Sequence, residues 1–527
     1  MINSIAEIFE NAIHAHQEGK LEEAEINYRK VLALNPDHIV AHGNLGALLY
    51  KTERFDESEE ILKKTIELKP DYVDALHNLG LLLYIRNKLD EAEEIFKKVI
   101  ELKPDYAEAH YNLGNTLYNL KKFDEAEKSY KKSIEFKPDY AQAYYNLGSL
   151  QKEFIRLHEA EINLKKAIEL KPDYAEAHHG LGNILNDLGK FDKAEISYKK
   201  AIQLNPDFVE AHHGLGNTFQ ATGRLDEAEI SYKKAIELKP GFTMALMSKG
   251  LILFVKGKYE LALKDFDACD SIDSRPRSLY TLYALGRTEE IYQRINQQSK
   301  IDDKNLKVAA FSSFIFNKEK RETEHNFCNN PINFIYNSNL KLHLKNSNLF
   351  INDVIEELKS VDTYWEPYGK STTKGSQSMG NLFKNPSEKL QKLKSIIFNE
   401  IDAYYLKFKD SDCSFIKKWP LKKNIQGWHV ILKQQGYQNA HIHSGGWLSG
   451  VIYLKVVPSI DKNEGAIEFS LNGERYFDVN SPYVIHKPKI GDIVFFPSSL
   501  HHRTIPFTTD DDRITISFDL IPFSENY

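Results

Sequence analysis

The chain has 527 residues, of which 42% are hydrophobic and 27% are charged, and its net charge is −6. This length exceeds what one compact core holds, and the apolar content excludes a disordered chain. A charge so mildly negative argues against a nucleic-acid binder, and three cysteines are too few for a disulfide scaffold. We therefore expect a multidomain protein without a nucleic-acid partner.

The N-terminal segment lacks the basic and apolar pattern of a signal peptide, and the sequence contains no run of about 18 apolar residues. The low cysteine content fits a reducing compartment. The sequence therefore predicts a cytoplasmic protein that does not span a membrane.

The first half of the chain repeats itself every 34 residues, and proline marks the period at positions 36, 70, 104, 138, 172, 206 and 240. A Leu-Gly pair, a small residue and a large residue recur in step with it, as at Gly114, Ala126 and Tyr130. Small residues let two antiparallel helices approach, large ones fill the groove between them, and proline ends the second helix. The period therefore predicts a solenoid of helix pairs.

This pattern resembles the tetratricopeptide repeat over residues 3–274, which is about eight repeats, and 278–295 resembles a capping helix pair. The resemblance implies an all-α solenoid over 1–297 with a concave groove along its first helices.

Asparagines stand in register on those predicted first helices, at Asn44, Asn78, Asn112 and Asn146. Because carboxamides both donate and accept hydrogen bonds, such a file suits an extended peptide backbone. It resembles the asparagine ladder in the repeats of the protein O-linked N-acetylglucosamine transferases. We expect a protein or peptide partner in this groove. The alternatives are that the asparagines are only repeat consensus, and that the arm is a scaffold or forms a homo-oligomer.

Histidines and tyrosines recur beside these asparagines, and a stripe of metal sites is one interpretation of their spacing. No carboxylate accompanies them in register, so we expect packing or ligand stacking instead.

The residue vocabulary changes near position 300. Residues 298–420 predict helices at 351–360 and 387–408, separated by a loop at 365–383 that is rich in Gly, Ser and Thr. Residues 421–527 contain short β-branched and aromatic runs split by Gly, Pro or Asn, which predict an antiparallel barrel or sandwich. The predicted fold class is α+β multidomain, with a solenoid, a helical lead-in and a β core over these three ranges.

Two histidine motifs lie on the predicted β framework. His441 and His443 share one face, because alternate residues of an extended segment point the same way. His502 follows in the segment FPSSLHH, and three imidazoles on one side of a metal leave its other face open. Arg513, on the next predicted strand, suits bidentate pairing with a carboxylate.

These segments resemble a branch of the 2-oxoglutarate and Fe(II)-dependent oxygenases over about 305–527. The chain has HIH, SGVIY, FPSSLHHRTIP and RITISFD where the branch has HxH, SGVYY-like, FPSxLxHxxxP and RxSISF-like segments. The resemblance implies a double-stranded β-helix, or jelly roll, that hydroxylates a substrate and releases succinate and carbon dioxide. It also implies that Fe(II) binds to His441, His443 and His502. The resemblance likewise implies that 2-oxoglutarate binds to Arg513, with help from Thr515 and Tyr453.

One departure from that family concerns the ligand set. Most members have HxD or HxE, and here His443 replaces the carboxylate. Glu464 or Glu468 is an alternative source of a carboxylate, and the segment 375–377 either borders the site or is a solvent loop. We expect His429, His486 and His501 to be ordinary surface or core residues.

Three other functions stay open at this point. They are a cupin-like metalloenzyme that does not use 2-oxoglutarate, a non-catalytic scaffold with a degenerate barrel, and an enzyme for a small molecule or glycan that the repeats merely tether. Arg513 favours the oxygenase, because an ordinary cupin metal site does not need it.

Overall fold

The computed structural model describes residues 4–367, 370–378, 380–458 and 463–522. Contacts divide the chain into two compact units, residues 1–245 and 246–527, which are described separately below. The domain bounds predicted at 297 and 420 follow sequence character rather than packing, and they stay predictions. Among the described helices, none has both the length and the hydropathy that crossing a bilayer requires.

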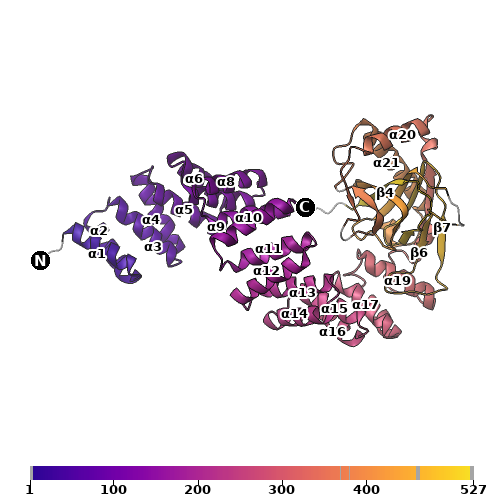
Figure 1. The fold of residues 1–527 in the computed structure, drawn as a ribbon, viewed down its shortest axis with the longest axis horizontal. Coiled ribbons are helices and arrows are strands. Elements are labelled where there is room, and N and C mark those ends of the chain that lie inside the picture. Colours follow the sequence, from indigo (N-terminus) through magenta and orange to yellow (C-terminus); the bar gives the residue numbers. More distant parts are fainter. Residues whose placement is uncertain (1–3, 368–369, 379, 459–462, 523–527) are drawn as a thin grey trace. The chain divides into compact units, whose positions relative to one another are not determined.

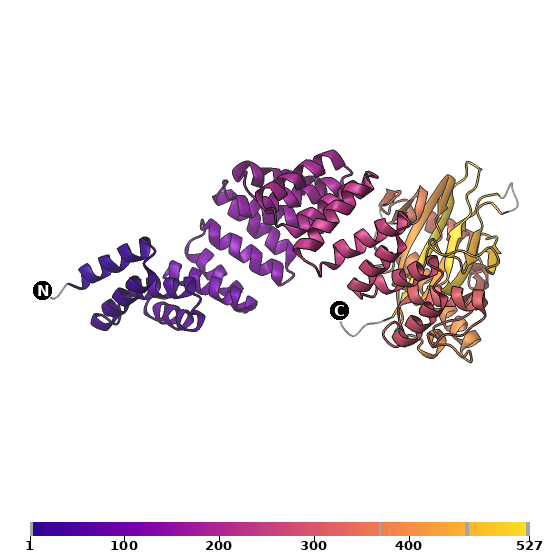
Figure 2. The same ribbon diagram turned by 90° about the horizontal axis from the view of Figure 1, so that it is seen from below.

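The first unit consists of antiparallel helix pairs stacked side by side (Figure 1, Figure 2). Its helices are α1 (Ile5–Gln17), α2 (Leu21–Leu34), α3 (Ile39–Lys51), α4 (Phe55–Leu68), α5 (Val73–Ile85), α6 (Leu89–Leu102), α7 (Ala107–Asn119), α8 (Phe123–Phe136), α9 (Ala141–Glu153), α10 (Leu157–Leu170), α11 (Ala175–Asp187), α12 (Phe191–Leu204), α13 (Val209–Ala221) and α14 (Leu225–Leu238).

The repeated glycines explain how closely the two helices of a pair approach. A Cβ added at Gly114 would lie 2.6 Å from the ring of Tyr130, and one at Gly216 would lie 2.5 Å from the ring of Tyr232. Each large side chain therefore occupies the space that its glycine leaves free. The predicted solenoid is confirmed.

Successive repeats are joined by an ion pair that recurs with the period. A basic residue that precedes each second helix reaches a glutamate 29 positions earlier, as in the 2.6 Å contact between Arg156 Nη2 and Glu127. The other members of this series are Arg54–Glu25, Lys88–Glu59, Lys122–Glu93, Lys190–Glu161 and Arg224–Glu195. The glutamates are largely shielded from solvent, so the series fixes the register of one repeat on the next.

The turn between the two helices of a pair needs one residue in the left-handed region. Gly189 and Gly223 fill this position in two repeats, with φ of 69° and 75°. Ile155 holds the equivalent position with φ of 59°, although its β-branched side chain opposes that conformation.

The second unit begins within α15 (Thr243–Val255) and combines helices with β structure. Its further helices are α16 (Tyr259–Cys269), α17 (Ser274–Ala284), α18 (Thr288–Gln298), α19 (Leu306–Glu319), η1 (Pro331–Phe334), η2 (Leu340–Leu342), α20 (Ser347–Leu358), α21 (Glu388–Phe408) and α22 (Ser414–Lys417). Its strands are β1 (Tyr336–Asn339), β2 (Thr363–Trp365), β3 (Thr372–Ser378), β4 (Asn424–Gln438), β5 (Leu448–Lys455), β6 (Ile467–Ser470), β7 (Tyr483–His486), β8 (Asp492–Pro497), β9 (His501–Thr504) and β10 (Arg513–Ile521).

Within the described residues, these strands form two antiparallel sheets. The larger has the order β1-β8-β5-β10-β4-β3-β2, and the smaller has the order β7-β6-β9. One face of the larger sheet packs under α20 and α21, and the other meets the smaller sheet, where the rings of Phe469 and Phe496 lie 4.9 Å apart. This sandwich confirms the predicted fold class.

The helices α17 and α19 pack on the smaller sheet through an aromatic cluster. The ring of Tyr476 lies 5.1 Å from Tyr280, 5.0 Å from Phe311 and 4.8 Å from Phe314. The helices after residue 245 therefore share a core with the sheets.

Strand β10 has two different faces because its side chains alternate. Ile516, Phe518 and Leu520 enter the core beneath the helices. The opposite face is polar, although nearly all of it is buried: it carries Arg513, Thr515, Ser517 and Asp519.

The loop predicted at 365–383 is wrong for residues 372–378 and agrees with the structure at 366–367, 370–371 and 380–383. Residues 372–378 form β3, which pairs with β4 on one side and β2 on the other, and its bulge lies between Thr373 and Gly375. Composition favoured a loop, but β4 offers an edge with unpaired backbone groups, and pairing satisfies them. Residues 368–369 and 379 of this segment lie outside the described residues.

Candidate functional site

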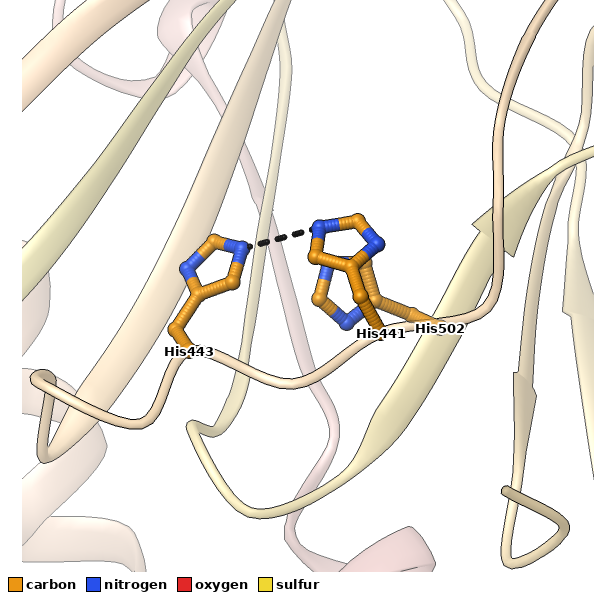
Figure 3. A group of neighbouring side chains, drawn as sticks. All are labelled: His441, His443 and His502. Atoms are coloured by element: carbon orange, nitrogen blue, oxygen red, sulfur yellow. Dashed lines mark hydrogen bonds between the residues drawn. The ribbon is translucent and has the colours of Figure 1, made fainter. Parts of the chain in front are cut away.

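Three histidines meet where the two sheets approach each other. His441 forms an isolated β-bridge with His502 of β9, and His443 follows two residues later in the segment that leads to β5. The ring nitrogens of these three residues lie within 4.8 Å of one another, and Figure 3 shows His443 facing the other two rings. In the described part of the chain, no other His, Cys, Asp and Glu side chains gather in this way.

The hydrogen bonds of the three rings fix their tautomers. The Nδ1–H of His441 donates to the carbonyl of Asn439 at 2.6 Å, and that of His502 to the carbonyl of Leu500 at 3.2 Å. The Nδ1–H of His443 donates to Asp519 Oδ1 at 2.6 Å. Each Nε2 therefore carries the lone pair, which is the arrangement of metal-binding histidines.

The spacing of the Nε2 atoms suits a common ion. Those of His441 and His443 are 3.3 Å apart. Two lone pairs so close repel each other, whereas two neighbouring ligands of one metal, each at about 2.1 Å, lie about 3 Å apart. The three residues thus fit a divalent metal, with the remaining positions open.

Burial keeps the imidazoles of His441 and His502 in the neutral form that binds metals. It is the main cause that lowers the pKa of His441 to about 3, with a contribution from His443. Burial likewise holds the pKa of His502 well below its usual value. At neutral pH both rings are uncharged and available as ligands.

The carboxylate beside this cluster is Asp519, which the sequence analysis missed. It comes from β10, 76 residues after His443, and its Oδ1 also accepts a hydrogen bond of 2.7 Å from the Ser449 hydroxyl. Gly446 allows its close approach, because a Cβ there would lie 3.0 Å from the Asp519 carboxyl carbon. In the sequence, the feature that could have pointed to Asp519 is its place at the end of the segment RITISFD.

The two glutamates considered as alternatives lie elsewhere. Glu468 pairs with Arg503 through two hydrogen bonds of 2.9 and 2.8 Å. Glu464 accepts a hydrogen bond from Thr508. Their carboxylates are thus engaged on the surface, so the suggestion that one of them completes the histidine cluster is wrong for this structure.

Arg513, Thr515 and Tyr453 form a second cluster. The guanidinium of Arg513 lies 5.0 Å from the centre of the Tyr453 ring, and Thr515 pairs with Tyr453 across β10 and β5. Burial is the main cause that lowers the pKa of Arg513, which is 2% exposed, and raises that of Tyr453 to about 12.

No carboxylate among the described residues pairs with Arg513, and both its Nε and the Tyr453 hydroxyl lack a hydrogen-bond partner. A buried cation without an anion is costly, so these residues fit an anionic ligand.

A cavity of about 550 Å³ opens beside the histidines. His441, His443 and Asp519 line it, together with Trp428 and Gln377. Gln377 belongs to the segment 375–377, which therefore borders the site as part of β3. Arg513 does not line this cavity.

His501 and His429 are not members of the cluster. His501 lines a second cavity, of about 180 Å³, together with His502, and burial lowers the pKa of His501 to about 4. His429 is fully buried in β4.

The four asparagines of the predicted file are half-buried, and their place in a peptide-binding groove stays a prediction. The Asn146 side chain donates to Tyr111 at 3.1 Å and to Asn115 at 2.7 Å, and Asn112 contacts His77 at 3.0 Å. Several repeat histidines bond to the carbonyl of the proline six positions earlier: His42, His110, His178 and His212. These contacts account for the recurring side chains through packing.

Comparison with known families assigns both units. A family model described as "Putative 2OG-Fe(II) oxygenase" matches residues 426–519. Tetratricopeptide repeat models match 15–80, 80–121, 107–140, 141–174, 163–196, 182–223 and 209–242. The chain joins tetratricopeptide repeats to a 2-oxoglutarate and Fe(II) oxygenase-family domain. The oxygenase-family match spans both histidine motifs, Arg513 and Asp519.

Several solved structures are similar to part of this chain. YrrB, described as a tetratricopeptide repeat protein with an unusual peptide-binding site, is 25% identical, with a TM-score of 0.32, over 36% of this chain and 97% of its own. MamA is 31% identical, with a TM-score of 0.30, over 31% and 95%. PilF of Pseudomonas aeruginosa is 18% identical, with a TM-score of 0.37, over 39% and 94%. The search of curated proteins finds no match.

Proposed function

We propose that the chain is a 2-oxoglutarate and Fe(II)-dependent hydroxylase whose substrate is a protein or peptide held by the repeats. His441, His443 and His502 would hold the metal, and Arg513 would hold the far carboxylate of 2-oxoglutarate with Thr515 and Tyr453 beside it. The observation that carries the proposal is the conjunction of three converging Nε2 lone pairs with a buried arginine that has no protein anion.

Iron with 2-oxoglutarate supplies dioxygen activation, so that a C–H bond becomes C–OH while 2-oxoglutarate and dioxygen yield succinate and carbon dioxide. The residues of this chain do the positioning. The Asn439 and Leu500 carbonyls and Asp519 keep the Nδ1 protons in place, so that each Nε2 faces the shared point. The barrel shields Arg513 from water, which strengthens its attraction for a carboxylate.

The protein or peptide substrate is supported by the repeats in the same chain. The groove offers half-buried amides along several repeats, and tetratricopeptide repeats commonly mediate protein–protein interaction. Homo-oligomer formation and a cytoplasmic location stay predictions.

Anaerobic titration with Fe(II) and then 2-oxoglutarate tests the ligand set. We expect a weak visible charge-transfer band that Arg513→Ala abolishes. Arg503→Ala, which removes an exposed arginine from its pair with Glu468, is the matched control and should keep the band. A native chain without the band, or a band that persists in Arg513→Ala, would contradict the proposal.

Succinate release with a peptide library tests the reaction. Metal binding without any succinate would instead support the cupin-like alternative, which three neutral imidazole ligands favour. If the chain neither binds metal nor releases succinate, the non-catalytic scaffold is the alternative that remains.

A further inference from the structure

A cavity of about 340 Å³ opens in the first unit, between α9 and α11. Its lining includes Gly148, Ser149, Leu164 and Gly180. The cavity lies entirely among residues of the repeats and is separate from the histidine site.

The next repeat shows what normally fills this space. There a Cβ added at Gly182 would lie 2.7 Å from the ring of Tyr198, and one added at Gly214 would lie 2.5 Å from the same ring. The Tyr198 hydroxyl donates to Asn183 at 2.7 Å. The ring therefore lies between two glycines and ends on a carboxamide.

Two side chains are smaller at the cavity than at the equivalent positions 34 residues later. Leu164 stands where the next repeat has Tyr198, and Ser149 stands where it has Asn183, the acceptor of the Tyr198 hydroxyl. Gly148 and Gly180 correspond to the two glycines of the next repeat. A Cβ at Gly180 would meet Leu164 only at 3.3 Å. A Cβ at Gly148 would meet Leu164 at 3.0 Å, so Leu164 reaches both glycines but leaves unfilled the space that the longer tyrosine side chain takes up in the next repeat.

Tyr145, which lines the cavity, lacks one aromatic contact that its equivalents in other repeats make. His77, His179 and His213 each contact the ring 19 positions later in the chain, at 5.9, 5.9 and 5.6 Å. The ring of Tyr111 makes the same contact at 6.2 Å, whereas the residue 19 positions after Tyr145 is Leu164, which has no ring. An incoming ring would complete the same series of contacts.

The charged side chains that line the cavity offer no free charge to an occupant. Lys152 and Glu153 carry opposite charges there, and both are engaged, because Lys152 lies 4.0 Å from Asp187 and Glu153 accepts a hydrogen bond from Tyr118. The Ser149 hydroxyl offers a neutral partner in place of the missing amide.

We propose that this cavity, which we call the Gly180 pocket, binds a tyrosine-like aromatic side chain from an extended peptide segment. The ring lies between Gly148 and Gly180, and its hydroxyl faces Ser149. This inference specifies a recognition element of the substrate or partner proposed above, and it does not depend on metal chemistry.

The first test uses 4-fluorophenol, an analogue of the tyrosine side chain, and fluorine NMR on the full chain without iron or 2-oxoglutarate. We expect saturable binding to the native chain. Leu164→Tyr fills the pocket with the side chain that its neighbours carry there, and should weaken binding at least tenfold. Ile162→Tyr adds the same ring to the same helix at a position 68% exposed, and should change binding less than twofold.

A second variant guards against misfolding of the first. Gly180→Asn restores the residue type of Asn112 and Asn146, and should also weaken binding at least tenfold. Circular dichroism checks that both variants fold. No saturable binding to the native chain, equal binding by the folded Leu164→Tyr, or equal binding of a trifluoromethyl aliphatic alcohol would overturn the proposal.

Selection from a random dodecapeptide library then tests the peptide itself, with Leu164→Tyr as the counter-selection. Enrichment of one aromatic position supports the proposal, and no aromatic enrichment overturns it. Because neither test measures succinate, a negative outcome here is distinguishable from failure of the oxygenase proposal.

Discussion

Asp519→Asn should weaken metal binding by the histidine cluster, because Asp519 supplies the only carboxylate that contacts these rings among the described residues. In the native chain its Oδ1 accepts from both His443 and Ser449, at 2.6 and 2.7 Å. The neutral amide removes a negative charge from behind the His443 ring. Its NH₂ group also competes to reverse the tautomer, which would place the proton on Nε2.

The size of the effect follows from the geometry. A carboxylate one imidazole ring away from a divalent ion lies roughly 6 to 7 Å from it, which gives about 1 kcal/mol in water and about 5 kcal/mol at an effective dielectric of 20. Loss of such a partner typically costs 10- to 100-fold in metal affinity, or about 1.4–2.7 kcal/mol, which falls between these limits. We expect Asp519→Asn to bind metal about 10- to 100-fold more weakly.

Anaerobic calorimetry with Mn(II) and Co(II) measures this affinity, and the visible spectrum of the Co(II) form reports the ligand set. Asp512→Asn is the matched control, since Asp512 pairs with Lys433 at the surface, at 2.8 Å, and should leave affinity unchanged. Affinity of Asp519→Asn within twofold of the native chain, or an equal loss in both variants, would refute this reasoning.

Three further predictions concern the second cluster and the stability of the repeats. Tyr453→Phe removes a buried hydroxyl beside Arg513. It should raise KM for 2-oxoglutarate by about three- to tenfold and leave metal affinity unchanged. An unchanged KM would exclude Tyr453 from cosubstrate binding. Ile155→Gly should raise the free energy of unfolding by about 0.5–1 kcal/mol in urea titrations, because it relieves the left-handed conformation at the turn, whereas a loss of stability would show that Ile155 is not strained there. The hydrogen bond from Arg156 is the main cause that lowers the pKa of Glu127 to about 2, which is below its value in the unfolded chain. The stability that this pair contributes is therefore present above about pH 5 and is lost as pH falls toward 2. The free energies of unfolding from urea titrations at pH 6 and pH 3 should therefore differ less in Glu127→Gln than in the native chain, by about 1 kcal/mol, and an equal pH dependence would contradict this role.

Both clusters of the second unit consist of residues that the sequence analysis singled out, but it did not find their supporting contacts. His441, His443, His502 and Arg513 stand in motifs short enough to recognise along the chain. Asp519 belongs to the last of these motifs, yet its contact with His443 depends on how β10 pairs with β5. The segment 372–378 was predicted as a loop because its composition is polar, and only the neighbouring edge of β4 makes it a strand.

The sequence by itself determined the period of 34, the helix pairs and the β core, because these depend on local spacing, small residues at close approaches and the alternation of side chains. Only the tertiary structure decided which distant residues meet. It joined the three Nδ1 protons to their acceptors, left Arg513 buried without an anion, and opened the Gly180 pocket where two side chains are smaller than in the next repeat. The reason is physical: local patterns fix the backbone of each element, whereas a site depends on contacts between elements that are far apart in the chain.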